Sequence, residues 1–194
     1  MRLSPVLNLS ATAAFALITP SFAQAEEGAA PVAATLEFMI GLSNKFHDGK
    51  KERDGRLALG IIPGADKMLA RVFGIGGEMA FVWAGDEDDK EARLVVSPHL
   101  RARMSFPIVD KITFDGLLGI GPSVWTPVDG VSDAKGGATR FGWSLRFAFG
   151  GGYQFNETVA AFANVGYYTS TTYGSDHERN VNSIPLNVGL RAAF

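Results

Sequence analysis

Ser97 and His99 form the pair of side chains in this sequence best suited to nucleophilic chemistry. A histidine base can activate a serine hydroxyl, but a third group, usually a carboxylate, must orient the histidine. Residues two apart in an extended strand lie on the same face. The pair by itself lacks the orienting carboxylate, so we predict that it is not catalytic and that the protein is not an enzyme.

The other polar residues do not indicate a metal, cofactor or nucleic-acid site. His47 and His177 fall in predicted loops, without the spacing of a metal site. The acidic run at 86–89 lacks the glycine and the spaced ligands of a calcium-binding loop. The glycines at 74–77 lack a third glycine at the spacing of a nucleotide-binding loop, and no helix is predicted after them. The chain has no cysteine and a formal net charge of −2, which excludes thiolate sites and does not favour nucleic acid.

Charged residues within otherwise apolar stretches are the most informative polar feature. Nine positions of this kind are Arg93, Arg101, Arg103, Arg140, Arg146, Arg191, Glu37, Glu78 and Asp115. An isolated charge in a confined interior is costly, so we expect these groups to form ion pairs. Their mutual positions depend on the elements that carry them.

Those elements are predicted to be long strands. From 92 to 106, every second residue beginning with Ala92 is apolar, and the intervening residues are polar except Val95. Such alternation indicates a strand with one apolar and one polar face. Its length exceeds the usual ~5–6 residues of a soluble strand and reaches the ~9–11 residues that cross a bilayer.

The same alternation recurs along the chain and predicts eight strands. They lie near 35–43, 56–62, 72–84, 92–106, 112–125, 139–152, 158–168 and 183–194. The predicted long connections are 44–55, 85–91, 127–138 and 169–182, and the predicted tight turns are 63–67, 107–111 and 154–157. An even strand number with alternating long and short connections is typical of an outer-membrane barrel with both termini in the periplasm. We therefore predict an all-β, eight-stranded antiparallel transmembrane β-barrel.

In this barrel the apolar side chains face lipid and the charged ones face the lumen. We expect Arg191 to approach Glu37, because the last strand closes on the first. Neighbouring strands should also bring Glu78 near Arg101 or His99, and Asp115 near Arg103. The predicted lumen network is Glu37, Glu78, His99, Arg101, Arg103, Asp115, Arg146 and Arg191. Eight strands enclose a space that side chains can fill, so this network should plug the lumen.

Aromatic residues near the strand ends are expected at the two membrane interfaces. These residues are Trp83, Trp125, Tyr153, Tyr167 and Tyr168.

The N-terminus has the pattern of a secretory signal peptide. Arg2 precedes an apolar stretch at 11–18, and Ala23-Gln24-Ala25 provides small residues at a cleavage site. The apolar stretch is shorter than the ~20 residues of a membrane-spanning helix. We predict a signal peptide at 1–25, a flexible lead-in at 26–34 and the barrel at 35–194.

With its signal peptide, eight alternating segments, Gly-rich stretch at 150–153 and terminal segment at 187–194, the chain resembles the bacterial outer-membrane β-barrels typified by the OmpA transmembrane domain and the opacity-type surface proteins. The resemblance implies that Leu190 and Phe194 belong to the C-terminal element that the barrel-insertion machinery recognises. Ala192 departs from the family pattern, where an aromatic residue is common.

The predicted function is a structural or surface-interaction role in the outer membrane, namely membrane integrity, adhesion or host contact through the loops. Expected partners are outer-membrane lipid and lipopolysaccharide, the barrel-assembly machinery and a possible host or surface ligand. An alternative is a narrow anion-preferring pore, because arginines outnumber acids among the inward charges. Two weaker alternatives are a lipid A-modifying enzyme, whose His-x-Ser order differs from the order found here, and a soluble periplasmic lipocalin-like binder.

Overall fold

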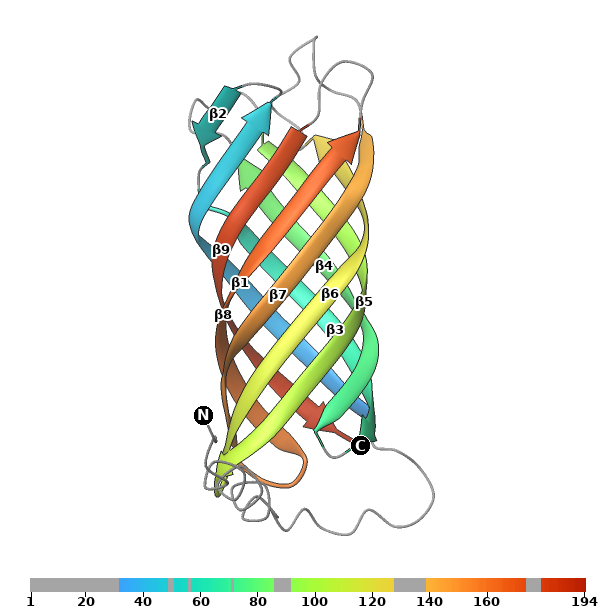
Figure 1. Ribbon diagram of the computed structural model, residues 1–194, viewed down its shortest axis with the longest axis vertical. Helices are drawn as coiled ribbons and strands as arrows, with labels where there is room; N and C mark the ends of the chain where they lie inside the picture. The colour runs from blue at the N-terminus through green and yellow to red at the C-terminus, as the bar shows by residue number, and fades with distance from the viewer. Residues whose placement is uncertain are drawn as a thin grey trace, which may run out of the picture.

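The computed structural model describes residues 32–48, 51–55, 57–70, 72–85, 92–127, 139–173 and 179–194. These residues form strands throughout (Figure 1). The strands are β1 (Val32–Asp48), β2 (Lys51–Asp54), β3 (Leu59–Ala70), β4 (Phe73–Gly85), β5 (Ala92–Val109), β6 (Ile112–Pro127), β7 (Arg140–Gln154), β8 (Val159–Tyr173) and β9 (Arg179–Ala193). Among the described residues, no helix is long and apolar enough to cross a bilayer.

Eight of these strands close into one antiparallel barrel. Strand β1 pairs with β3 on one side and with β9 on the other, and each intervening strand pairs with its neighbour in sequence. Val32 and Phe194 exchange backbone hydrogen bonds of 3.2 and 2.8 Å where the barrel closes. The short β2 pairs only with the end of β1 and lies within the predicted loop at 44–55. The predicted number of barrel strands is therefore confirmed.

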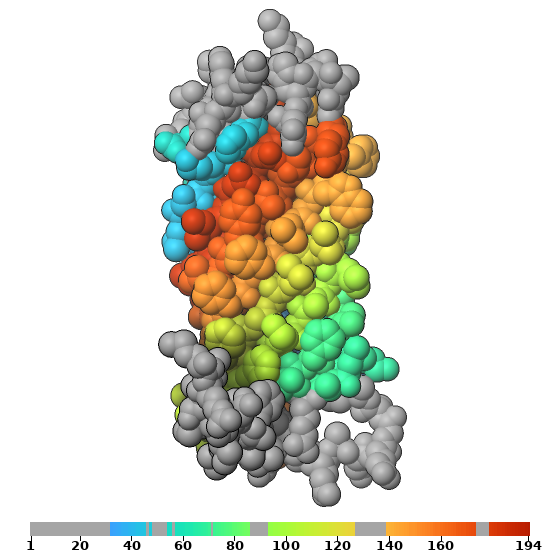
Figure 2. Space-filling model, viewed as in Figure 1, coloured from blue at the N-terminus to red at the C-terminus, as the bar shows by residue number. Residues whose placement is uncertain are grey.

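The two faces of the barrel have opposite polarity. On β1, Glu37 and Met39 are each 1% exposed, whereas Phe38 between them is 50% exposed. The same alternation continues on the other long strands, and the outer surface is covered with exposed large hydrophobic side chains. Figure 2 shows part of this surface, where the side chains of β6 to β9 form a continuous wall. The predicted orientation, apolar outside and charged inside, is confirmed.

The predicted turn at 63–67 is wrong, because these residues continue β3 down to Ala70. Pro63 is opposite Leu36 of β1, while the register to β4 passes from Ile61 to Gly64 without it. Proline lacks the N–H donor of a ladder hydrogen bond, so it is tolerated where one side of the strand does not use that donor. Strand β3 ends at Ala70 and β4 begins at Phe73, and Asp66 becomes a strand residue.

Several strands extend further than the alternation predicts. Strand β1 begins at Val32, inside the predicted lead-in. Strand β5 extends to Val109, leaving a tight turn in which Lys111 has φ 63°. Strands β8 and β9 shorten the predicted loop at 169–182 from both ends. The predicted signal peptide, the acidic run at 86–89, His177 and most of the segment 127–138 lie outside the described residues.

Candidate functional site

The inner face of the barrel carries a group of ionic side chains that we call the charged layer. It lies nearer the end of the barrel where β1 begins and β9 ends, which also holds the turn between β5 and β6 and is called the turn end below (Figure 1). Its members are Glu37, Asp66, Glu78, His99, Arg101, Arg103, Asp115, Arg146 and Arg191. All except Arg191 are at least nine-tenths buried. The structure thus brings together every predicted network residue and adds Asp66.

Arg101 connects three other strands to β5. Its Nε and Nη2 donate to the two carboxylate oxygens of Asp66 on β3, at 2.7 and 2.5 Å. Its Nη1 donates to Thr35 on β1 at 2.9 Å and to Glu78 on β4 at 3.2 Å. The contact between Arg101 and Asp66 is therefore bidentate, which is the strongest form of an arginine–carboxylate contact.

Arg146 joins opposite walls of the barrel. Its Nη1 donates to Glu78 Oε2 at 2.7 Å, and its Nη2 donates to Glu37 Oε2. Strand β7 is separated from β4 and from β1 by intervening strands, so both bonds cross the lumen. Glu78 contacts Arg101, Arg146 and His99 at once, and the predicted contacts of Glu78 with Arg101 and with His99 are present.

Asp115 accepts hydrogen bonds from the two remaining arginines of the layer, Arg103 and Arg191. Arg103 Nη2 donates to Asp115 Oδ1 at 3.1 Å, as predicted. Arg191 Nη1 also donates to Asp115 Oδ1, at 3.3 Å, which corrects the predicted Arg191–Glu37 pair. In the β1–β9 register Arg191 lies opposite Thr35, nearer the turn end than Glu37. Its side chain instead extends across the lumen to β6.

The charged layer is balanced in formal charge. Asp66 makes the acids four, and these face four arginines, which are Arg101, Arg103, Arg146 and Arg191. Arg93 and Arg140 belong to the other end of the barrel, at the start of β5 and of β7. The excess of arginine inferred from the sequence therefore does not occur within the layer, because Arg93 and Arg140 lie outside it and the buried acid Asp66 had been assigned to a turn.

Two inward glycines leave space for this layer. A Cβ at Gly64 would lie 2.6 Å from Arg101 Nη1. A Cβ at Gly119 would lie 2.9 Å from Glu78 Oε1 and 3.2 Å from His99 Nδ1. Both distances are too short for ordinary contacts, so glycine is needed where these hydrogen-bonded groups approach the backbone.

Ser144, His99 and Glu78 have the connectivity of a hydrolytic triad, a combination that the sequence alone did not suggest. His99 Nε2 lies 2.7 Å from Ser144 Oγ, and His99 Nδ1 lies 2.8 Å from Glu78 Oε1. Ser97, the residue considered from the sequence, is instead hydrogen-bonded to Tyr168 at 3.2 Å. Ser144 is 3% exposed and His99 is 4% exposed, so a substrate has no route to the hydroxyl. Within the described residues, no group of acids and histidines could hold a metal ion.

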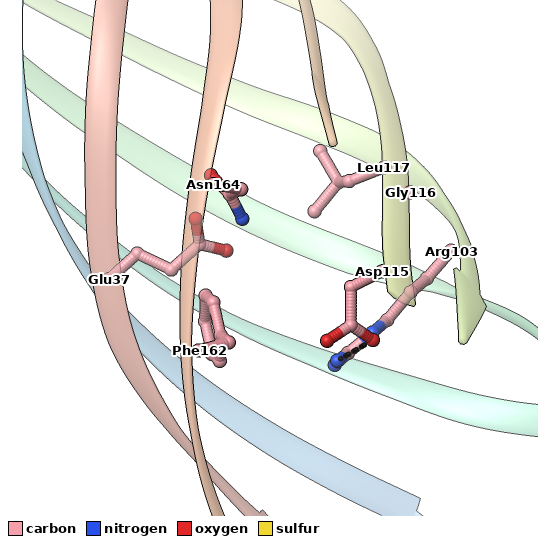
Figure 3. A pocket seen from close by; sticks show the side chains of 7 residues that line it. All are labelled: Glu37, Arg103, Asp115, Gly116, Leu117, Phe162 and Asn164. Carbon is pink, nitrogen blue, oxygen red and sulfur yellow. Dashed lines mark hydrogen bonds and ion pairs between the residues drawn. The ribbon is translucent and has the colours of Figure 1, made fainter. Parts of the chain in front are cut away.

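A small cavity borders the charged layer (Figure 3). Glu37, Arg103, Asp115, Phe162 and Asn164 line it, and its volume is about 10 Å³. Figure 3 shows the acids, the arginine and the asparagine around this space, with Arg103 bonded to Asp115. A space of this size holds about one water molecule. It is too small for an organic ligand.

Two aromatic residues expected at the membrane interface lie inside the barrel. Trp125 and Tyr168 are each 0% exposed, so the interface prediction is wrong for both. Trp83 and Tyr153 do lie on the outer surface, at 42% and 47% exposed. Trp125 and Tyr168 pack with the apolar residues Val82, Val95 and Val181 in the half of the lumen towards the long loops. The C-terminal residues Leu190 and Phe194 are exposed, at 57% and 78%.

Comparison with known proteins gives information on the fold. No protein-family model matches the chain, and no curated protein matches its sequence. The crystal structure of Neisserial surface protein A shares 15% sequence identity, with a TM-score of 0.57 over 87% of this chain and 100% of that chain. Ail of Yersinia pestis, at 15% identity, aligns over 84% of this chain and 99% of that chain with a TM-score of 0.48. The chain therefore has the eight-stranded β-barrel fold found in the outer-membrane protein Neisserial surface protein A.

Proposed function

We propose that the protein is a small outer-membrane barrel with a closed lumen, and that it acts as a structural or surface-contact element rather than as a channel or an enzyme. The observation that carries this proposal is the reversed polarity of the barrel. Phe38, Leu118 and Phe149 are 50%, 51% and 54% exposed on the outside. Arg101 and Arg146 are each 0% exposed on the inside.

This arrangement suits a bilayer for two physical reasons. Backbone N–H and C=O groups have no partner in hydrocarbon, so only a closed barrel or a helix can cross it. The pairing of β1 with β9 provides that closure. Exposed apolar side chains on every face would favour aggregation in water, whereas lipid solvates them. A soluble lipocalin-like barrel would have the opposite orientation, with its apolar side chains around an internal ligand.

The charge balance within the charged layer argues against the anion-preferring pore. Four acids and four arginines are linked by ion pairs within this layer, and the cavity beside them has room for about one water molecule. The buried Ser144 hydroxyl likewise argues against a lipid A-modifying activity, which needs a nucleophile facing the lipid. The proposed partners are outer-membrane lipid and lipopolysaccharide at the outer surface, the assembly machinery, and a host or surface ligand at the loops.

Cysteine labelling in cells tests this proposal, because the natural chain has no cysteine. Thr139 is exposed beside the long loops, and Asn156 is exposed in a turn at the opposite end. We expect a membrane-impermeant thiol reagent to label Thr139→Cys on intact cells and Asn156→Cys only after the outer membrane is permeabilised. Equal labelling of both positions in intact cells, or recovery of the protein in the soluble periplasmic fraction, would contradict the proposal.

A further inference from the structure

We propose that the lumen is sealed twice, by the charged layer and by a separate aromatic–hydroxyl layer nearer the long loops, and that either layer alone keeps the barrel closed. This inference deepens the closed-lumen function proposed above and rests on it. The second layer consists of Val82, Val95, Ser97, Ser123, Trp125, Tyr168, Ser170 and Val181.

Hydrogen bonds hold this second layer across the lumen. Trp125 Nε1 on β6 donates to Ser170 Oγ on β8 at 2.8 Å, and Ser170 Oγ donates to Ser123 Oγ at 2.9 Å. Tyr168 on β8 is hydrogen-bonded to Ser97 on β5 at 3.2 Å. These strands are not neighbours in the sheet. The bonds therefore link β8 to β5 and to β6 through side chains inside the barrel.

Packing around the rings leaves no side chain of this layer exposed to solvent. Val82, Val95, Ser97, Ser123, Ser170 and Val181 are all 0% exposed, like the two rings themselves. Serine hydroxyls form hydrogen bonds with the polar atom of each ring, so these atoms do not need water as a partner. A constriction of this type blocks ions because they would lose their hydration without receiving charged ligands in return.

The two layers are held by separate sets of contacts. Arg101 and Arg146 pair with acids, whereas Trp125 and Tyr168 pair with serines. His99 meets Tyr168 at the boundary through ring packing, with centroids 6.5 Å apart. Loss of the central Glu78 and Arg101 side chains would leave the ring-to-serine bonds in place. Loss of the rings would likewise leave the arginine–carboxylate pairs intact.

Single-channel recordings in planar bilayers test the inference with three variants and the wild type. Glu78→Ala with Arg101→Ala opens the charged layer and preserves its net charge. Trp125→Ala with Tyr168→Ala opens the second layer, and the third variant combines all four changes. We expect no current steps from the wild type or from either pair, and steps from the combination. Steps from either pair alone, or a folded combination that never conducts, would overturn the double seal. Conductance of the wild type would instead refute the closed lumen itself.

A labelling experiment that avoids the fourfold variant gives an independent result. Ser123→Cys places a thiol in the second layer, next to Ser170, which accepts the hydrogen bond from Trp125. In detergent micelles, with Thr139→Cys as the reactive control, we expect a water-soluble thiol reagent not to label Ser123→Cys. Adding Trp125→Ala should make that thiol reactive, whereas adding Glu78→Ala with Arg101→Ala should not. Labelling after the charged-layer change, or no labelling after Trp125→Ala, would contradict separate seals.

Discussion

Glu78 contacts three other members of the charged layer and lies at its centre. Its carboxylate lies within hydrogen-bond distance of His99, Arg101 and Arg146, at 2.8, 3.2 and 2.7 Å. Breaking a buried ion pair by removing one partner is costly, because the remaining charge is left in a medium that solvates it poorly. The contribution of Glu78 therefore lies as much in compensating two arginines as in its own bonds.

Neutralising this residue is expected to destabilise the barrel. Glu78→Gln retains the shape of the side chain but leaves Arg101 and Arg146 with less compensating charge, and the cost should be about 3–5 kcal/mol. Urea unfolding of the protein refolded in lipid measures this free energy. The matched control is Glu157→Gln, which changes an exposed turn residue and should shift stability by less than about 0.5 kcal/mol. Equal effects of the two changes would show that the charged layer does not stabilise the fold.

The strands determine which residues reach this layer. Strand β3 passes through Pro63 and carries Asp66 inward, opposite Gly76 of β4. Side chains alternate between the two faces of a strand, so the residues next to Asp66 face outward. Ala65 and Lys67 are indeed exposed on the outer surface. Continuation of one strand through a proline thus supplies both the fourth acid of the layer and an outward cation near the turn end.

An arginine that faces the lipid should lower the free energy of unfolding, by an amount that depends on its depth in the bilayer. Leu118 lies midway along β6 and is 51% exposed. In lipid, Leu118→Arg should cost roughly 2–4 kcal/mol, because it places a charge in the hydrocarbon. Leu69→Arg is the matched control, because Leu69 is 59% exposed one residue before the end of β3 and beyond the natural Lys67, and the change should cost about 0–1 kcal/mol. Unfolding in lipid vesicles measures both, and equal costs would contradict a bilayer centred on Leu118.

The whole barrel depends on joining its first and last strands. Strand β9 pairs with β1 from Ala193 opposite Ala33 to Arg179 opposite Asp48, with one register shift between Gly41 and Ser43. These strands are the first and the last of the barrel, so its closure depends on contacts between residues far apart in the sequence. Phe194 follows β9 and is 78% exposed, which leaves its ring available for recognition before closure.

Phe194 should matter more for assembly in cells than for the stability of the finished barrel. Its ring makes little contact with the protein, so Phe194→Ala should change unfolding in vitro by less than about 0.5 kcal/mol. We expect this variant to reduce the amount of protein in the outer membrane of cells. Phe155→Ala, at a ring that is 54% exposed in a turn, is the control and should not reduce it. Equal membrane levels of both variants would argue against a C-terminal recognition element.

The sequence by itself determined the strand type, the orientation of each face and the number of barrel strands. These properties follow from local alternation, since a strand presents every second residue to the same side. The pairings Glu78–Arg101 and Asp115–Arg103 could also be predicted, because they join neighbouring strands.

The tertiary structure decided the contacts across the lumen. Arg146 with Glu37, Arg191 with Asp115, and Trp125 with Ser170 join strands that are not adjacent. Their meeting depends on the stagger of the closed barrel, which no local pattern encodes. Asp66, Trp125 and Tyr168 lie inside the barrel, where the sequence had suggested a turn and the membrane interface. The charged layer therefore depends on contacts across the lumen that form only when the eight strands close.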